Sequence, residues 1–323
     1  MVAPIVLAGY LPAYFGIRAD GLPDIQGIAP ALAQQSRAII VSHYFGLAQS
    51  LHEVRAWCDT HNIALIEDCA HSYFGQAGDR PVGAWGDYCT ASLSKFFPVP
   101  EAGLLGSAKR TLKPLRLVRP GLRSQIKGVV DVLETASRYR RLNGLNELLG
   151  FIFSLRHRVR SAKTLDRPAK PNSEASMIES CDMGRVKQQP LLASMQLRRV
   201  LPRGRIIALR KRNFELYARL LSGVAGSRCL VAMPLRPVAP YVFPLWVDDA
   251  DRVYDILRAN GLPVFRWDRI WPNTPELPSD VGAGWSRHVL QLLCHQDLAE
   301  EAIRGTAEYV RTLLLAARAD PAG

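Results

Sequence analysis

Residues 38–67 read AIIVSHYFGLAQSLHEVRAWCDTHNIALIE and contain a complete strand-helix-strand unit. Residues 38–42 and 63–67 are short apolar runs rich in β-branched side chains, which is typical of buried strands. Between them, residues 50–53 (Ser-Leu-His-Glu) have the spacing of a capping box that starts a helix. A crossover of this kind joins parallel strands of one sheet. The sequence therefore predicts an α/β domain with a mostly parallel central sheet and helices on both faces.

Polar side chains follow the ends of two of these strands. Asp68 and His71 come just after the second apolar run, and a third run, residues 89–93, is followed by Lys95. Ligands of parallel α/β sheets bind beyond the carboxyl ends of the strands. We therefore expect these three side chains to meet at one edge of the sheet.

Pyridoxal phosphate is the cofactor whose chemistry these residue types suit. It needs a lysine for the Schiff base and an acid that keeps the pyridine nitrogen protonated. It also needs a group beside the ring and donors for its phosphate. Lys95, Asp68, His71 and Ser92 can fill these roles in that order, so the sequence predicts a cofactor site with Lys95 as its catalytic residue.

These residues belong to a series of motifs that resembles the DegT/DnrJ/StrS family of pyridoxal-phosphate-dependent sugar aminotransferases, which have the type I aminotransferase fold. The motifs are, in chain order, His43-Tyr44-Phe45-Gly46, Glu67-Asp68-Cys69-Ala70-His71, Gly83-Ala84-Trp85-Gly86-Asp87, Ser92 to Lys95, and Pro98 to Gly103. The resemblance is strong over residues 20–106 and weaker at 240–244, 265–267 and 294–297. It implies that Lys95 bears the Schiff base and moves the proton, with Asp68 on the ring nitrogen. It also implies that His71 lies against the ring and that Ser92 holds the phosphate.

The resemblance further implies a nucleotide-linked keto-sugar as substrate, an amino acid such as glutamate as amine donor, and a homodimer. The product would enter polysaccharide or glycoconjugate biosynthesis. A nucleotide sugar carries a diphosphate, which arginine binds with two parallel hydrogen bonds. Arg266 and Arg269 are candidates for that contact. His43 and His295 are the other candidate substrate-binding residues.

Two features depart from the family pattern. Its members carry, ahead of the region that corresponds to Met1, a Gly-Ser/Thr-x-Ala phosphate-binding turn and an aromatic residue that stacks on the cofactor. From this comparison we expect an N-terminally truncated chain. The alternative function is then a catalytically inactive homologue that acts as a sugar-nucleotide binding or interaction module. The second departure is Ala102, where the family commonly has glycine.

Composition and charge exclude several other classes. With 48% hydrophobic and 22% charged residues, the chain is neither disordered nor fibrous. It has no apolar run long enough for a membrane span and no secretory signal, which predicts a cytoplasmic protein. Its six Cys stand singly, so no disulfide framework and no metal site is predicted.

The net charge of +12 is concentrated in the middle of the chain. Residues 109–212 hold 25 Lys and Arg against 7 Asp and Glu. This segment lacks the motifs of nucleic-acid-binding domains, so no nucleic-acid partner is predicted. Its apolar positions over residues 142–155 favour packing against the protein or a second subunit, with contact to a membrane surface as the alternative.

We divide the chain into a large cofactor-binding domain, residues 1–190, and a smaller C-terminal α+β domain, residues 191–323. The first includes a basic region at 107–185 that we expect to be helical.

One rival interpretation concerns Ser92 to Lys95, which also fits the Ser-x-x-Lys nucleophile motif of penicillin-binding proteins. That class requires Ser-Asp-Asn and Lys-Thr-Gly as well, and neither string occurs.

Overall fold

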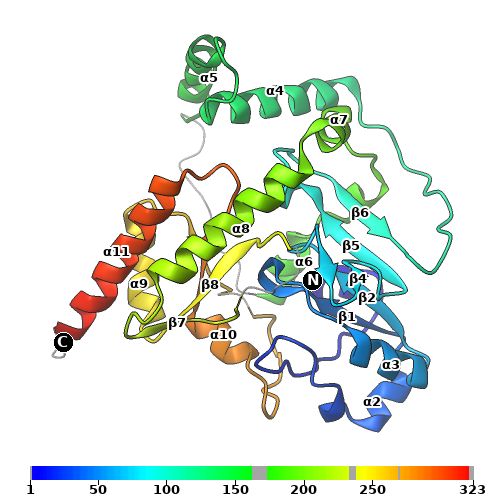
Figure 1. Ribbon diagram of the computed structural model, residues 1–323. Coiled ribbons are helices and arrows are strands. Elements are labelled where there is room, and N and C mark those ends of the chain that lie inside the picture. The colour runs from blue at the N-terminus through cyan, green and yellow to red at the C-terminus, as the bar shows by residue number, and fades with distance from the viewer. Residues whose placement is uncertain (1, 162–172, 233–237, 268–269, 320–323) are drawn as a thin grey trace.

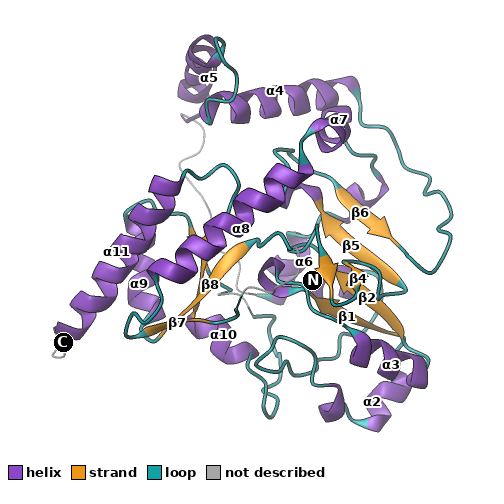
Figure 2. Cartoon of the chain, viewed as in Figure 1, coloured by secondary structure: helices purple, strands orange, loops and turns teal. Residues whose placement is uncertain are grey.

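The computed structural model describes residues 2–161, 173–232, 238–267 and 270–319, which form two four-stranded sheets and a small two-stranded one, with helices around them (Figures 1 and 2). The helices are α1 (Val2–Leu7), α2 (Pro30–Gln35), α3 (His52–His61), α4 (Leu122–Arg138), α5 (Asn146–Ser161), α6 (Glu174–Glu179), α7 (Leu192–Val200), α8 (Arg203–Leu220), α9 (Ala250–Ala259), α10 (Gly282–His288) and α11 (Glu300–Ala319). The strands are β1 (Ala38–Ser42), β2 (Ala64–Asp68), β3 (Gln76–Ala77), β4 (Arg80–Pro81), β5 (Tyr88–Ser92), β6 (Gly103–Gly106), β7 (Ser227–Cys229), β8 (Val242–Val247), β9 (Val264–Phe265) and β10 (Val289–Leu293).

The first sheet has the order β1-β2-β5-β6, and its first three strands are parallel. β6 returns antiparallel to β5. Helices α2 and α3 cover one face through a buried cluster that includes Ile39, Val41 and Leu65. Alternate residues of the same strands point to the opposite face, which carries Asp68. The predicted α/β class with a mostly parallel sheet is confirmed.

The expected capping box before α3 is wrong. The helix begins at His52, with Leu51 in the capping position and no side-chain cap. The Ser50 hydroxyl accepts a hydrogen bond from the His52 backbone N–H at 3.4 Å, one residue earlier than a capping box requires. The spacing of the motif was present, but the chain enters the helix one residue later than Ser50 would allow.

The second sheet is antiparallel throughout, in the order β7-β8-β10-β9. Helices α8, α9 and α11 share a core with it, to which Phe214, Phe243, Val253 and Ile303 contribute. Its β10 strand was not predicted, because four of its five residues are fully buried and it follows α10 without a turn signal. The proposed domain boundary near residue 190 falls between the two sheets and stays a prediction.

The basic middle segment forms α4, α5 and α6, whereas residues 107–121 are not helical. Pro114 and Pro120 interrupt that stretch, since proline removes a backbone donor and cannot continue a helix. Leu145, just before α5, and Leu148 and Ile152 on it have exposed side chains, whereas Leu142 and Leu149 are half-buried. This region therefore packs in part against α4, and its contact with a second subunit or a membrane surface stays a prediction.

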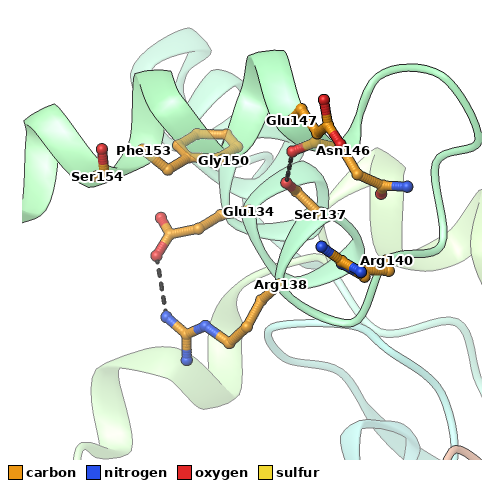
Figure 3. Close-up of a pocket in the computed structure, with 9 residues that line it drawn as sticks. All are labelled: Glu134, Ser137, Arg138, Arg140, Asn146, Glu147, Gly150, Phe153 and Ser154. Carbon is orange, nitrogen blue, oxygen red and sulfur yellow. Dashed lines mark hydrogen bonds and ion pairs between the residues drawn. The ribbon is translucent and has the colours of Figure 1, made fainter.

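A cavity of about 420 Å³ lies between α4 and α5 (Figure 3). Glu134 pairs with Arg138 at 3.3 Å along its wall, and the Ser137 hydroxyl donates to the Asn146 carbonyl at 3.0 Å. None of its lining residues is a predicted site residue.

Within the part of the chain that the structure describes, no helix has the length and apolar composition to cross a membrane.

Candidate functional site

Asp68 is the last residue of β2 and lies at the carboxyl end of the parallel strands. It is in register with Ser42 of β1 and Thr90 of β5, so these three side chains share one face of the sheet. One carboxylate oxygen of Asp68 accepts a hydrogen bond from the Ala70 N–H at 2.9 Å, and the other lies 3.3 Å from the Ser42 hydroxyl. The carboxylate is half-buried and is held by its own turn.

Lys95 ends a short 3-10 turn, Leu93–Lys95, directly after β5. Burial lowers the pKa of its amine, and the nearby Asp68 carboxylate opposes that shift. Among the described residues, no carboxylate lies within ion-pair distance of the amine. Its Nζ atom instead lies 5.5 Å from the ring centre of Tyr241. Lys95 is thus a half-buried amine in the electrostatic field of Asp68, and their roles at the two ends of a cofactor stay a prediction.

His71 lies in the same space. Burial lowers the pKa of its imidazole to about 3, and the charge of Lys95 adds to the effect, so the ring is neutral at ordinary pH. It stacks on Tyr241 with ring centres 4.4 Å apart and planes 22° apart. Trp267 lies nearly parallel on the same ring at 6.3 Å. The structure therefore brings Asp68, Lys95 and His71 together.

Ser92 ends β5 on the same sheet face as Asp68, and its hydroxyl lies 3.2 Å from that of Ser94. Two adjacent hydroxyls of this kind can donate to an anion. The structure places Ser92 two residues along the strand from Thr90, which is in register with Asp68. Its role with phosphate stays a prediction.

Gly46 explains why the turn after β1 needs glycine. Its φ is +83°, and a Cβ atom there would lie 2.3 Å from the Tyr241 backbone nitrogen and 2.7 Å from the His71 carbonyl. Phe45, just before it, accepts a hydrogen bond from the Tyr241 N–H at 2.8 Å. This close approach sets Tyr241 beside His71.

Glu67 points to the other face of β2, away from Asp68. Its carboxylate is fully buried and accepts hydrogen bonds from the backbone N–H groups of Gly83, Trp85 and Gly86 at 3.1, 2.6 and 2.6 Å. His43 Nε2 lies 3.0 Å from the same carboxylate. These contacts hold the pKa of Glu67 below its usual value despite burial. His43 therefore supports the glycine-rich turn, and its predicted contact with substrate is not favoured by this placement.

The ligand atoms of His43, Glu67 and Cys69 lie within 4.8 Å of one another, which is the spacing of a metal site. Both Glu67 oxygens already receive hydrogen bonds. Burial and the Glu67 charge raise the pKa of the Cys69 thiol. Hydrogen bonding accounts for this cluster without an ion.

The other predicted substrate residues have contacts of their own. Arg266 donates to the Asp251 carboxylate on α9 and, at 2.9 Å, to the Arg287 carbonyl. Its fork is therefore engaged within the second sheet and its helices. Arg269 lies outside the described residues. His295 follows β10; burial and the Arg210 charge lower the pKa of its ring to about 4, and its Nδ1 accepts from the Asp297 N–H at 3.2 Å.

Sequence reasoning missed two groups of residues near Lys95. Tyr241 and Trp267 come from segments more than 140 residues away, so no local pattern relates them to His71. Arg210 on α8 donates to the Lys95 carbonyl at 2.7 Å, although a single arginine in a basic helix carries no sequence signal. Ala102 has φ of +140°, a conformation that favours glycine, which gives a physical meaning to the departure noted above.

The sequence of residues 1–107 matches the DegT/DnrJ/EryC1/StrS aminotransferase family. One similar protein is GDP-perosamine synthase of Vibrio cholerae, 29% identical over 126 residues, which are 38% of this chain and 34% of that protein. Another is UDP-N-acetyl-3-dehydro-alpha-D-glucosamine 3-aminotransferase of Acidithiobacillus ferrooxidans, 34% identical over 82 residues, 25% of this chain and 21% of that protein. The chain thus spans about a third and a fifth of the length of these relatives.

Solved structures resemble the whole described chain. PseC of Helicobacter pylori, an aminotransferase involved in pseudaminic acid biosynthesis, gives a TM-score of 0.62 at 14% identity, covering 97% of this chain and 76% of that one. AtS13 of Actinomadura melliaura gives 0.61 at 20% identity, covering 95% and 75%. These likenesses confirm the predicted type I aminotransferase fold. In its sequence, the part of the chain that is similar to the DegT/DnrJ/EryC1/StrS aminotransferase family is residues 1–107, about a third of its length.

Proposed function

We propose that this protein is a pyridoxal-phosphate-dependent aminotransferase that acts on a nucleotide-linked keto-sugar, with Lys95 as its catalytic residue. An amino acid such as glutamate would donate the amine, and the product would enter polysaccharide or glycoconjugate biosynthesis. The proposal includes a cytoplasmic homodimer, which the family resemblance implies.

The observation that carries the proposal is the grouping of Lys95, Asp68 and His71 at one sheet edge. The amine and the carboxylate influence each other electrostatically without an ion pair between them. The imidazole lies close enough to the amine for the Lys95 charge to lower its pKa. An amine and an acid that form no ion pair with each other, with a neutral ring in the same region, suit the two ends of a small charged heterocycle.

The residues present fit pyridoxal phosphate. Lys95 would bind its aldehyde carbon, Asp68 its ring nitrogen, His71 one face of the ring, and Ser92 its phosphate. When bound, this cofactor supplies a carbon that bonds to amines and a ring that withdraws electrons from the neighbouring atom. The buried sulfhydryls nearby are protonated and do not compete for the aldehyde, since burial raises the pKa of Cys69.

The chain's own groups suit the proton transfers that transamination needs. Burial lowers the pKa of Lys95, so a larger fraction of its Nζ is neutral and able to accept a proton near pH 7. The Asp68 carboxylate would hold a proton on the pyridine nitrogen by its negative charge. His71 stays neutral and adds no charge beside the ring. Behind Lys95, a buried cluster that includes Phe96 and Phe97 limits access of water.

The substrate class rests on the relatives. Two of them are named for nucleotide sugars, GDP-perosamine and a UDP-linked dehydroglucosamine. The second name states transfer of an amine to position 3 of a dehydro sugar. These names favour a nucleotide-linked keto-sugar for this chain.

The test is cofactor attachment followed by turnover. Purified protein is mixed with pyridoxal phosphate, reduced with borohydride and digested, and mass spectrometry locates the modified lysine. We expect attachment at Lys95, its loss in Lys95→Ala, and no change in Lys127→Ala, a control lysine on exposed α4 that pairs with Asp131. The loaded protein is then given glutamate and a panel of keto-sugar nucleotides. Absence of an amino-sugar product with any of them, despite attachment at Lys95, would refute the transaminase function; binding of a nucleotide sugar by cofactor-free protein would favour the binding-module alternative.

A further inference from the structure

Arg210 is a fully buried arginine in the middle of α8. Burial lowers the pKa of its guanidinium to about 10, so it remains charged at neutral pH. Within the described residues, no carboxylate lies within ion-pair distance of it. A buried cation without an ion pair is costly, and an apolar side chain of similar volume would avoid that cost. Its presence therefore needs a reason other than packing.

The guanidinium donates only to neutral oxygens, and these come from three separate segments. Nη2 donates to the Lys95 carbonyl at 2.7 Å, Nη1 to the Pro240 carbonyl at 3.2 Å, and Nε to Gln296 Oε1 at 2.7 Å. Gln296 in turn donates to the Phe96 carbonyl at 3.0 Å. One side chain thus fixes the turn after β5, the approach to β8 and the loop after β10.

The same side chain is packed against the rings of the site. Its Cζ lies 4.6 Å from the ring centre of Phe96 and 5.9 Å from that of Tyr241. Tyr241 is the ring that lies under the Lys95 amine and stacks on His71. Arg210 therefore bonds to the Lys95 backbone and lies beside the Tyr241 ring that the amine also approaches.

We propose that Arg210 is a positioning residue, which holds the Lys95 turn and Tyr241 so that the amine points at the Asp68 side of the site. This inference rests on the proposed role of Lys95. One arm of the rigid planar guanidinium holds the Lys95 carbonyl while the other two hold Pro240 and Gln296, a combination that a lysine at position 210 could not reproduce. Displacing a reacting group by about 1 Å can cost on the order of 100-fold in rate.

The test measures Lys95 itself in cofactor-free protein. Acetic anhydride labelling across a pH series, read by mass spectrometry, gives the reactivity and pKa of each lysine. We compare Arg210→Met and Arg210→Lys with Arg212→Met, a control that removes a charge from the same helix where the side chain contacts Asn213 and Leu298. We expect Arg210→Met and Arg210→Lys to shift the Lys95 labelling profile, and to slow pyridoxal phosphate attachment at Lys95 at least about tenfold.

Arg212→Met should leave both readouts within about twofold of the unsubstituted protein. If Arg210→Met fails to fold, Gln296→Leu serves instead, because it removes one hydrogen-bond partner of Arg210. We then expect the Lys95 labelling profile to shift less than in the Arg210 variants and in the same direction as in Arg210→Lys. Unchanged Lys95 labelling and attachment in folded Arg210 or Gln296 variants would overturn the positioning role. Absence of attachment in the unsubstituted protein would instead refute the proposed cofactor, and the labelling profile would still test Arg210.

Discussion

Glu67 and Asp68 are adjacent acids on opposite faces of β2, and we predict that neutralising each has opposite consequences. Glu67→Gln should destabilise the protein while leaving cofactor attachment nearly unchanged. Asp68→Asn should leave stability nearly unchanged while weakening attachment at Lys95. The two substitutions remove the same charge and alter the same chemical group, so each is the control for the other.

The magnitudes follow from the hydrogen bonds. Glu67 is fully buried and accepts three backbone N–H groups besides its contact with His43. A glutamine oxygen can still accept from Trp85 and Gly86, but its amide group then faces the Gly83 N–H, donor against donor. A buried donor without a partner costs about 1–3 kcal/mol, and the loss of charge weakens the remaining hydrogen bonds. We therefore expect Glu67→Gln to lower the free energy of unfolding by about 3 kcal/mol. Asp68→Asn keeps an oxygen for Ala70 and should cost less than about 1 kcal/mol.

Urea unfolding followed by fluorescence gives the stabilities, and borohydride trapping followed by mass spectrometry gives attachment at Lys95. We expect Asp68→Asn to lower the affinity for pyridoxal phosphate at least about tenfold, the equivalent of one buried charge-assisted contact. If Asp68→Asn destabilised the protein as much as Glu67→Gln, Asp68 would be a structural residue and the site assignment would fail. If Glu67→Gln were as stable as the unsubstituted protein, the turn at 83–86 would not depend on this carboxylate.

Three further results are expected. The pKa of Glu67 is lowered in the folded state, so its contribution to stability is full above about pH 4.5 and is lost as the pH falls through the lower folded value. Glu67→Gln should therefore make the free energy of unfolding depend less on pH in that range. An unchanged pH dependence would contradict this. Ala102→Gly should raise the free energy of unfolding by about 1 kcal/mol in urea titrations, because φ of +140° strains alanine, whereas a loss of stability would show that the strain is absent. With a pKa of about 3, His71 is neutral between pH 5 and 8, so His71→Gln should not alter the pH dependence of cofactor attachment there; a titration near 6.5 that vanishes in the variant would refute the burial of this ring.

The sequence predicted the elements whose signals are local. The strands at 38–42 and 63–67 and the crossover helix between them have the right residue period, and the strand ends place Asp68 and Lys95 on one edge. The buried strand β10 lacked alternation and was not predicted. The helical expectation for 107–185 is wrong over 107–121, where prolines break the chain.

The parts of the site that were missed depend on contacts between distant segments. Tyr241 reaches His71 because Gly46 allows close approach of two backbones, and that requires the folded arrangement of both sheets. The sequence predicts His43 as a substrate contact, whereas in the structure its ring contacts the buried Glu67 carboxylate. A residue type and its position after a strand do not reveal which face its side chain will occupy when the turn that follows is irregular.

The Arg210 network has a consequence for how a bulky ligand could enter. Because one guanidinium joins the turn after β5 to the segments beside β8 and β10, the two sheets cannot swing apart at this point without breaking three hydrogen bonds. Admission by a hinge is therefore disfavoured. Entry of such a ligand would then depend on rotation of individual side chains. Trp267 stacks on Phe45 at 4.9 Å and faces His71, so its ring is the side chain whose rotation would open the site.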